Sequence, residues 1–355
     1  MKNIVLVILF VLLSIAGSYI LNAKPKLPKR VVFMIGDGMG LTQISGALTN
    51  YSGQNAFARF SVIGFSQTAS ADNYVTDSGA GATAFAIGKK AKNGAIGVDE
   101  FDQAQIGLFE LVKKANGKTA VVATSSITHA TPASFYAHVA SRNSEEEIAK
   151  FLLNGNCDIA IGGGSKFIYN RTDGIALDSL LIQKGFQLYA DTFIHAVNSN
   201  QFIYTLAPDG MQSIKEGRGN YLTQASELAL NHLSNASRGL IMIEGSQIDW
   251  GGHANDFEYM KLELLDFNES INYVLDQAAK DKETLVIVTA DHETGGLSLL
   301  KSTTNPKQFE VNYASKGHSG VMVPVFAYGP GAENFTGIYQ NTAIFQKIKK
   351  CLRLN

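Results

Sequence analysis

Cysteine is scarce in this sequence, and its scarcity excludes several kinds of site. The chain has 355 residues but only 2 cysteines, Cys157 and Cys351. Two cysteines are too few for a disulfide framework, although one disulfide between them stays open. Neither lies in a C-x-x-C pair or beside a histidine, so the sequence does not indicate a cysteine-based metal or redox site.

An excess of charge of either sign is also absent. The chain has 30 Lys and Arg against 31 Asp and Glu, which gives a net charge of −1. There is no basic stripe and no charged tail, so a nucleic-acid-binding surface is not indicated. With 45% hydrophobic and 17% charged residues, the composition is that of a globular protein long enough for one large α/β domain.

One long apolar run occurs, at the N-terminus. Lys2 precedes an apolar stretch over residues 4–15, and small residues follow up to Ala23. This pattern resembles a secretory signal peptide, so we expect residues 1–23 to direct export and the rest of the chain to be secreted or periplasmic. An uncleaved membrane anchor is the alternative, because the stretch approaches the length of a membrane-spanning helix. We expect residues 30–350 to form a single domain.

Short apolar segments alternate with amphipathic ones along the remaining chain. The apolar segments are 31–36, 119–124, 239–244, 284–290 and 323–329, and the amphipathic ones are 106–116, 144–154, 221–234 and 260–280. Continuously apolar strands are typical of a buried parallel sheet. The alternation therefore predicts a doubly wound α/β fold with a mostly parallel sheet and helices on both faces. Residues 165–220 are less regular, and we interpret them as a small excursion from the same domain.

Residues able to bind metal or phosphate gather at the ends of the predicted strands. In chain order they are Asp37, His129, Thr131, Arg142, Glu244, Asp249, His253, Asp291, His292 and His318. Ligands of doubly wound folds bind beyond the carboxyl ends of the strands, which is where these residues fall. Carboxylates with imidazoles suit Zn²⁺, and an all-oxygen set suits Mg²⁺.

Most of these residues also have a structural interpretation. Asp37 lies between glycines and could form a turn, and Asp249 with His253 could be a surface pair on one helical face. Asp291 and His292 could cap the next element. Glu244 is harder to explain in this way, because a carboxylate at the end of a buried strand needs a partner.

Ser78 has two interpretations within the segment VTDSGAGATA (75–84). Its neighbours are mostly glycine and alanine, and the chain from residue 82 favours a helix. Ser78 could cap that helix. On this segment alone the cap is the favoured interpretation, and the alternative is a nucleophile at a helix N-terminus, where free N–H groups favour an anion such as phosphate.

Six long motifs resemble those of the alkaline phosphatases in order and spacing, from about residue 30 to residue 345. They are GDGMG (36–40), VTDSGAGATA (75–84), HATPASFYAHVASR (129–142), EGSQIDWGGH (244–253), TADHETGG (289–296) and GHSG (317–320). The resemblance implies hydrolysis of small-molecule phosphate monoesters at alkaline pH. It also implies a homodimer, since the family is commonly dimeric.

The resemblance further implies a role for each motif residue. Ser78 would form a phosphoserine intermediate, and Arg142 would bind the phosphoryl group. The implied ligands are Asp249, His253 and His318 for one zinc ion, Asp37, Asp291 and His292 for a second, and Asp37, Thr131 and Glu244 for a magnesium ion.

Two positions depart from the enteric bacterial pattern of the family. His129 stands where that form has Asp, and Trp250 stands where it has Lys. In the family, both positions lie around the third metal and the phosphate. We therefore expect the tightness of phosphate binding to differ from that of the enteric form, and the identity of the third ion stays open. His and Trp at these places resemble marine relatives.

Two other functions are compatible with the same residues. One is a phosphodiesterase or sulfatase of the same superfamily, which usually lacks the third ligand set. The other is a secreted phosphate- or metal-binding protein without turnover, which would need a broken nucleophile or ligand set.

Overall fold

The computed structural model describes residues 27–190, 193 and 197–355. The predicted signal peptide, residues 1–23, lies outside the described residues. Within the described part of the chain, no helix has the length and apolar character needed to cross a membrane.

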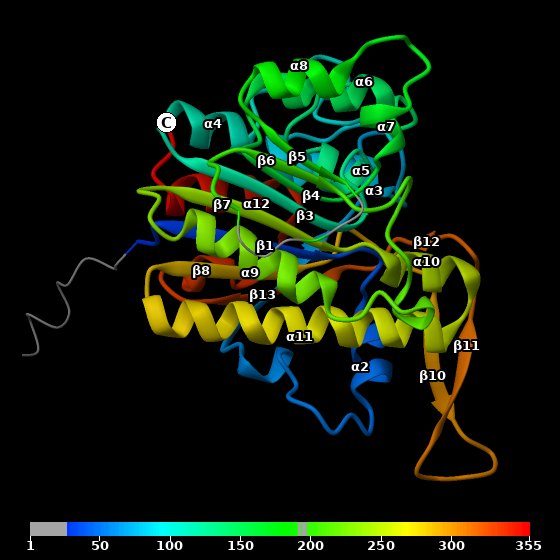
Figure 1. The fold of residues 1–355 in the computed structure, drawn as a ribbon. Helices are drawn as coiled ribbons and strands as arrows, with labels where there is room; N and C mark the ends of the chain where they lie inside the picture. Colours follow the sequence, from blue (N-terminus) through cyan, green and yellow to red (C-terminus); the bar gives the residue numbers. More distant parts are fainter. Residues whose placement is uncertain (1–26, 191–192, 194–196) are drawn as a thin grey trace, which may run out of the picture.

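A 10-stranded sheet forms the centre of the molecule, in the order β14-β2-β13-β8-β1-β7-β3-β4-β6-β5 (Figure 1). Its strands are β1 (Arg30–Gly36), β2 (Val62–Gln67), β3 (Lys118–Ser126), β4 (Ile159–Gly163), β5 (Gln187–Ala190), β6 (Phe202–Thr205), β7 (Gly239–Gly245), β8 (Thr284–Thr289), β13 (Val323–Tyr328) and β14 (Gly337–Gln340). Only β13 runs antiparallel to its neighbours in this sheet. The predicted doubly wound, mostly parallel fold is confirmed.

Helices cover both faces of the sheet. They are α2 (Leu41–Leu48), α3 (Ser78–Ile87), α4 (Leu108–Lys114), α5 (Ala130–Ala133), α6 (Glu145–Lys150), α7 (Lys166–Tyr169), α8 (Leu177–Gln183), α9 (Tyr221–Leu233), α10 (Gln247–Ala254), α11 (Phe257–Asp281) and α12 (Thr342–Cys351). Side chains of α3–α8 and α12 share one buried apolar cluster, and those of α2 and α9–α11 share the other.

Strand β1 shows how the sequence builds the two layers. Because successive strand residues point to opposite faces, Val31, Phe33 and Ile35 pack into the first cluster, while Val32 and Met34 pack into the second. All five are fully buried. A continuously apolar strand is therefore required here, since both faces of the sheet are covered.

The segment 165–220 contributes more regular structure than its sequence indicates. Strands β5 and β6 lie in it and extend the central sheet at one edge. Their four residues each are too short to give a periodic signal. Outside the sheet, β10 (Leu297–Lys301) and β11 (Phe309–Tyr313) form a projecting hairpin, at the lower right of Figure 1.

Helix boundaries differ in detail from the predictions. The predicted helix 144–154 is α6 followed by a 3-10 turn, η2 (Phe151–Asn154), which ends at the left-handed Gly155. After α4, the left-handed residue is Asn116 at φ 55°. Asparagine tolerates this conformation because its short polar side chain bonds locally.

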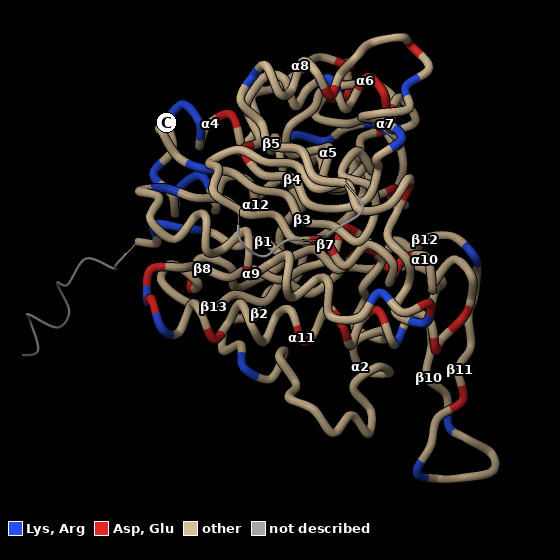
Figure 2. Tube along the Cα trace, viewed as in Figure 1, with Lys and Arg blue, Asp and Glu red and all other residues tan. Residues whose placement is uncertain are grey.

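Charged residues are distributed differently at the two ends of the sheet. Lys and Arg gather around α4 and the C-terminus, near the amino ends of the parallel strands (Figure 2). The carboxyl ends of the same strands carry the buried carboxylates described next. The candidate site therefore lies at the opposite end of the sheet from this group of Lys and Arg.

Candidate active site

Ser78 is the first residue of α3, and its hydroxyl lies inside the protein at 2% exposure. The residue before it, Asp77, is the helix cap, since its carboxylate accepts the N–H of Ala80 at 2.9 Å. The cap and the candidate nucleophile are thus neighbouring residues. The small residues have a packing role as well, because a Cβ at Gly81 would lie 3.0 Å from the Cβ of Asp291.

Four adjacent strands bring site residues to one place, and three of them carry acidic residues. Asp37 directly follows β1, Asp291 lies two residues beyond β8, and Glu244 is in β7. Because β1 pairs with both β7 and β8 in parallel, these carboxylates meet at the carboxyl-terminal ends of the three strands. After β3, the next strand, the connecting loop carries His129 and the short helix α5 carries Thr131.

The deepest ligand group consists of Asp37, Asp291 and His292, which we call the deep group. All three are fully buried. His292 Nε2 lies 3.4 Å from Asp37 Oδ1, 3.3 Å from Asp291 Oδ2 and 3.3 Å from Ser78 Oγ. The donor atoms of the deep group all lie within 4.8 Å of one another, a spacing suited to one metal ion.

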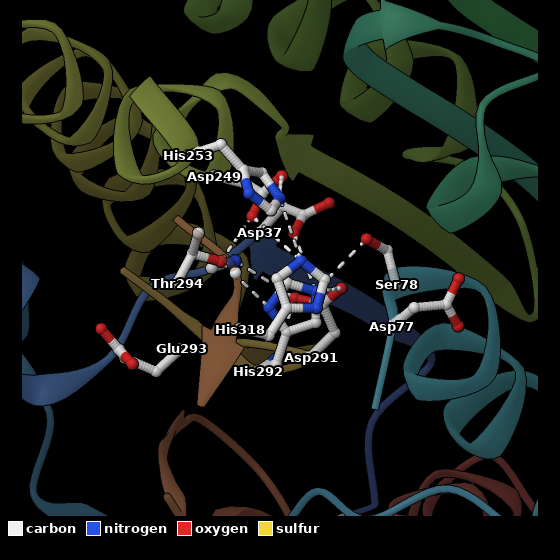
Figure 3. A network of polar contacts seen from close by, with 12 residues as sticks. Asp37, Asp77, Ser78, Asp249, His253, Asp291, His292, Glu293, Thr294 and His318 are labelled. Carbon is white, nitrogen blue, oxygen red and sulfur yellow. Dashed lines mark hydrogen bonds and ion pairs between the residues drawn. The ribbon is translucent and has the colours of Figure 1, made fainter. Parts of the chain in front are cut away.

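A second group, Asp249, His253 and His318, lies nearer the surface, and we call it the shallow group. His253 Nε2 is 3.3 Å from Asp249 Oδ2 and 3.1 Å from His318 Nε2, and His318 Nε2 is 3.6 Å from Asp249 Oδ1. The His253 side chain is 41% exposed and that of His318 is 13% exposed. The His318 ring stacks on His292 at 3.5 Å, so the two groups adjoin (Figure 3).

His292, a member of the deep group, also lies close to two residues of the shallow group. Its ring nitrogen lies within 4.8 Å of the donor atoms of Asp249 and His318 as well as those of the deep group. Figure 3 shows Ser78 reaching from α3 toward this imidazole.

The deep group is electrostatically incomplete without a cation. Burial raises the pKa of Asp37 well above its usual range, and the nearby carboxylates of Asp291, Asp249 and Glu244 add to this. Burial and the same kind of repulsion raise the pKa of Asp291 to about 8. Burial and the neighbouring His318 hold the pKa of His292 well below its usual value. Metal ions would remove this repulsion between carboxylates.

The shallow group forms internal ion pairs instead. The hydrogen bond to Asp249 raises the pKa of His253 to about 9. Burial favours a protonated Asp249, but the hydrogen bond from His253 and the nearby imidazoles outweigh it, so the pKa of Asp249 is lowered.

Thr131 and Glu244 lie beside Asp37, as the third ligand set requires. Thr131 Oγ1 is 3.5 Å from Asp37 Oδ2, and Glu244 Oε2 accepts a hydrogen bond from Ser125 Oγ at 3.1 Å. Burial raises the pKa of Glu244, although hydrogen bonds from Ser246 and Thr131 oppose the shift. These three side chains offer oxygen ligands only, which suits a hard cation such as Mg²⁺.

Arg142 contacts His129, one of the two residues that depart from the enteric pattern, and His129 in turn contacts the other, Trp250. Arg142 Nη1 donates to Asp77 Oδ2 at 2.9 Å, and its Nη2 lies 3.2 Å from His129 Nε2. The His129 ring meets Trp250 edge to face at 6.2 Å. Burial, together with the charge of Arg142, lowers the pKa of His129 to about 4, so His129 is neutral at pH 7.

The residues present fit bound metal ions. Among the described residues, Asp37 Oδ1, Asp291 Oδ2 and Glu244 Oε1 are buried side-chain oxygens without a hydrogen-bond partner. Unpaired buried carboxylate oxygens are costly, and cation coordination satisfies them. Imidazole and carboxylate ligands that meet beside a serine suit metal-assisted hydrolysis.

Sequence inspection missed three contributors to the site. Asp77 binds Arg142, and Thr294 Oγ1 donates to Asp249 and lies 3.3 Å from His292 Nδ1. Glu293 accepts a hydrogen bond from Gln43 Nε2 at 2.6 Å and another from Ser319 Oγ. The second bond fixes the residue directly after His318. All three residues lie inside the motifs that resemble the alkaline phosphatases. Their position in these motifs is the sequence feature that could have indicated a role in the site.

The fold and this site define a hydrolase of the doubly wound α/β class. The sequence model described as "Alkaline phosphatase" matches residues 28–308 and 298–354. The chain belongs to the alkaline phosphatase family, and it is an enzyme that hydrolyses phosphate monoesters.

Individual relatives agree with this membership. The structure of alkaline phosphatase from the Antarctic bacterium TAB5 is 42% identical, with a TM-score of 0.90 over 94% of this chain and 100% of that one. Alkaline phosphatase 3 of Bacillus subtilis is 30% identical over 92% of this chain and 89% of its own length. The alkaline phosphatase of Escherichia coli is 28% identical over 94% of this chain and 88% of its own.

Proposed function

We propose that Ser78 is the nucleophile of phosphate monoester hydrolysis and forms a phosphoserine intermediate. The observation that carries this is the placement of the buried Ser78 hydroxyl 3.3 Å from His292, at the start of α3. As the bond from Ser78 Oγ to phosphorus forms, the bond from phosphorus to the alcohol oxygen breaks. Water then displaces Ser78 from phosphorus and releases inorganic phosphate.

The residues around Ser78 orient the phosphoryl group. Arg142 offers a planar fork of N–H donors, and Asp77 fixes the direction of that fork. The start of α3 adds free backbone N–H groups and a positive dipole end. Ions bound to the two ligand groups would favour ionised serine and water and would stabilise the developing negative charge.

We propose zinc for the deep and shallow groups and Mg²⁺ for Asp37, Thr131 and Glu244. The mixed imidazole and carboxylate groups suit zinc, and the oxygen set suits magnesium. Two variants of the TAB5 enzyme, with a histidine changed to Glu or Asp, have structures with Mg bound in the site called M3. In those variants, which have Mg bound, an acidic residue replaces a histidine. We infer that the neutral His129 beside Thr131 would weaken binding of the third ion in this protein. Elemental analysis of the purified protein, before and after dialysis against a chelator, tests the stoichiometry.

A Ser78→Ala variant tests the nucleophile. Turnover of an aryl phosphate should fall by about 10³-fold or more while the metal content stays unchanged. Ser234→Ala, at an exposed serine at the end of α9, is the matched control. Unchanged turnover in Ser78→Ala would contradict the assignment. Faster hydrolysis of the matching methyl diester than of the monoester would favour the phosphodiesterase alternative.

Export and assembly are part of the same proposal. Residues 1–23 would act as the signal peptide, residues 30–350 as one domain, and the mature protein as a secreted or periplasmic homodimer. N-terminal sequencing of the exported protein and light scattering of the purified one test these points. Recovery in the membrane fraction with residues 1–23 intact would support the anchor instead.

A further inference from the structure

The carboxylate of Glu145 joins the two segments that carry Arg142 and His129. Glu145 is the first residue of α6, three residues after Arg142. Its Oε2 accepts a hydrogen bond from Ser126 Oγ at 2.8 Å and another from Thr128 Oγ1 at 2.7 Å. Ser126 ends β3, and Thr128 directly precedes His129.

The hydroxyls bound by Glu145 are inside the protein. Ser126 is 5% exposed and Thr128 is fully buried. Hydrogen bonds to an ionised carboxylate are stronger than those between neutral groups, and a buried hydroxyl left unpaired is costly. The contact is therefore a firm connection between the start of α6 and the loop after β3.

A second contact between the same two segments lies in the phosphate-binding region. Arg142 Nη2 lies 3.2 Å from His129 Nε2. Together with the bonds of Glu145, this contact closes a ring that consists of residues 126–129 and 142–145. Glu145 therefore links the two backbone segments on either side of the contact between guanidinium and imidazole, while Asp77 holds the guanidinium from another direction.

We propose that Glu145 is a positioning residue for phosphate binding. It keeps the segment of Arg142 in register with the loop of His129, so that the guanidinium is already oriented when the phosphoryl group arrives. Glu145 touches none of the reacting atoms and acts through Arg142. Preset orientation of a bidentate arginine lowers the cost of binding. The inference rests on the proposed role of Arg142.

The test compares substitutions on α6 in the metal-loaded full chain. Glu145→Ala should raise KM for an aryl phosphate and the calorimetric Kd for inorganic phosphate by about three- to tenfold. Glu145→Gln keeps an oxygen that accepts hydroxyl bonds, so it should stay within about twofold of the parent. Glu147→Ala is the matched control, because Glu147 lies on the same helix, is exposed and pairs with Lys150.

Two further variants separate positioning from folding. Thr128→Val removes one of the two bonds at nearly constant volume and should weaken phosphate binding in the same direction, by less. In an Arg142→Ala background, Glu145→Ala should add less than about a twofold change, because residues that act through one another are not additive.

Several outcomes would overturn the inference. One is an unchanged Kd for phosphate in Glu145→Ala, and another is an equal rise in Glu147→Ala. A third is a full additional loss in the Arg142→Ala background. A lower thermal midpoint with unchanged phosphate affinity would assign Glu145 a structural role only. If Arg142→Ala itself leaves the Kd for phosphate unchanged, the proposed role of Arg142 fails instead.

Discussion

The deep and shallow ligand groups share a site but differ in burial and in charge. The deep group, Asp37, Asp291 and His292, is fully buried, and repulsion raises the pKa of its carboxylates. In the shallow group, Asp249 is already paired with His253, which is 41% exposed. The deep group therefore depends on a cation for its charge balance, whereas the shallow group is partly balanced by its own histidines.

This difference predicts unequal metal retention. An ion in the deep group would be held by fully buried residues, and two of their carboxylate oxygens, Asp37 Oδ1 and Asp291 Oδ2, have no hydrogen-bond partner. An ion in the shallow group would compete with the ion pair between His253 and Asp249 and would exchange through the exposed imidazole. We therefore expect a tightly held ion in the deep group and an exchangeable ion in the shallow group.

The strongest test makes the same substitution in both groups. His292→Gln should lower kcat/KM by about 10³-fold, because His292 adjoins both groups and Ser78. His253→Gln should lower it by about ten- to a hundredfold, and added zinc should restore part of the loss. Activity measured across a zinc titration checks both. Equal losses, or recovery of His292→Gln alone, would contradict the comparison.

A smaller effect is expected at Thr294, which links the two groups. Its hydroxyl donates to Asp249 of the shallow group and lies 3.3 Å from Nδ1 of His292 in the deep group. If Nδ1 carries the proton and donates to Thr294, Nε2 is left free as a ligand. Thr294→Val should therefore weaken zinc affinity by about ten- to a hundredfold.

The control for Thr294 is the serine substitution, which keeps the hydroxyl and removes only a methyl group. Zinc affinity measured against a competing chelator should be nearly unchanged in Thr294→Ser. If the valine and serine variants lose the same affinity, the methyl group matters and the hydroxyl link does not.

The contacts of Thr294 also show what could not be predicted from the sequence. The continuously apolar runs predicted β1, β3, β7, β8 and β13, and their ends correctly indicated where Asp37, Glu244 and Asp291 would gather. The motifs added His318, which reaches the site from a two-residue strand that no periodicity could reveal. The pairing of Thr294 with Asp249 joins residues 45 positions apart and depends on how β9 (Glu293–Thr294) packs against α10.

The position of Gly38 illustrates the same limit. Its φ of +70° and the closeness of Thr294 Oγ1, 2.7 Å from where a Cβ would stand, require glycine. In sequence alone, GDGMG fits a simple turn equally well. Tertiary contacts decide between the two interpretations, because the nearby atoms come from α10 and from the chain after β8.

The smallest expected effect is a pH dependence of stability in the metal-free protein. Asp291 has a pKa of about 8 in the folded protein against 3.8 ordinarily, so at pH 7 it is protonated when folded and ionised when unfolded. Asp37 shifts in the same direction, and His253, at about 9 against 6.5, also retains a proton on folding. Since the folded state then binds more protons, the free energy of unfolding should fall as the pH rises from about 7 to about 8.

The slope from Asp291 is at most about 1.4 kcal/mol per pH unit. His292 and His129, whose pKa values are lowered by burial, are neutral in the folded state, and since their ordinary pKa of 6.5 lies below this range, they oppose the fall only slightly near pH 7. Urea unfolding of chelator-treated protein at several pH values measures the slope, and Asp291→Asn should reduce it. With metal bound the carboxylates are already ionised, so the fall should disappear. A metal-free stability that stays level or rises over this range would mean that the deep group is not held protonated without its ion.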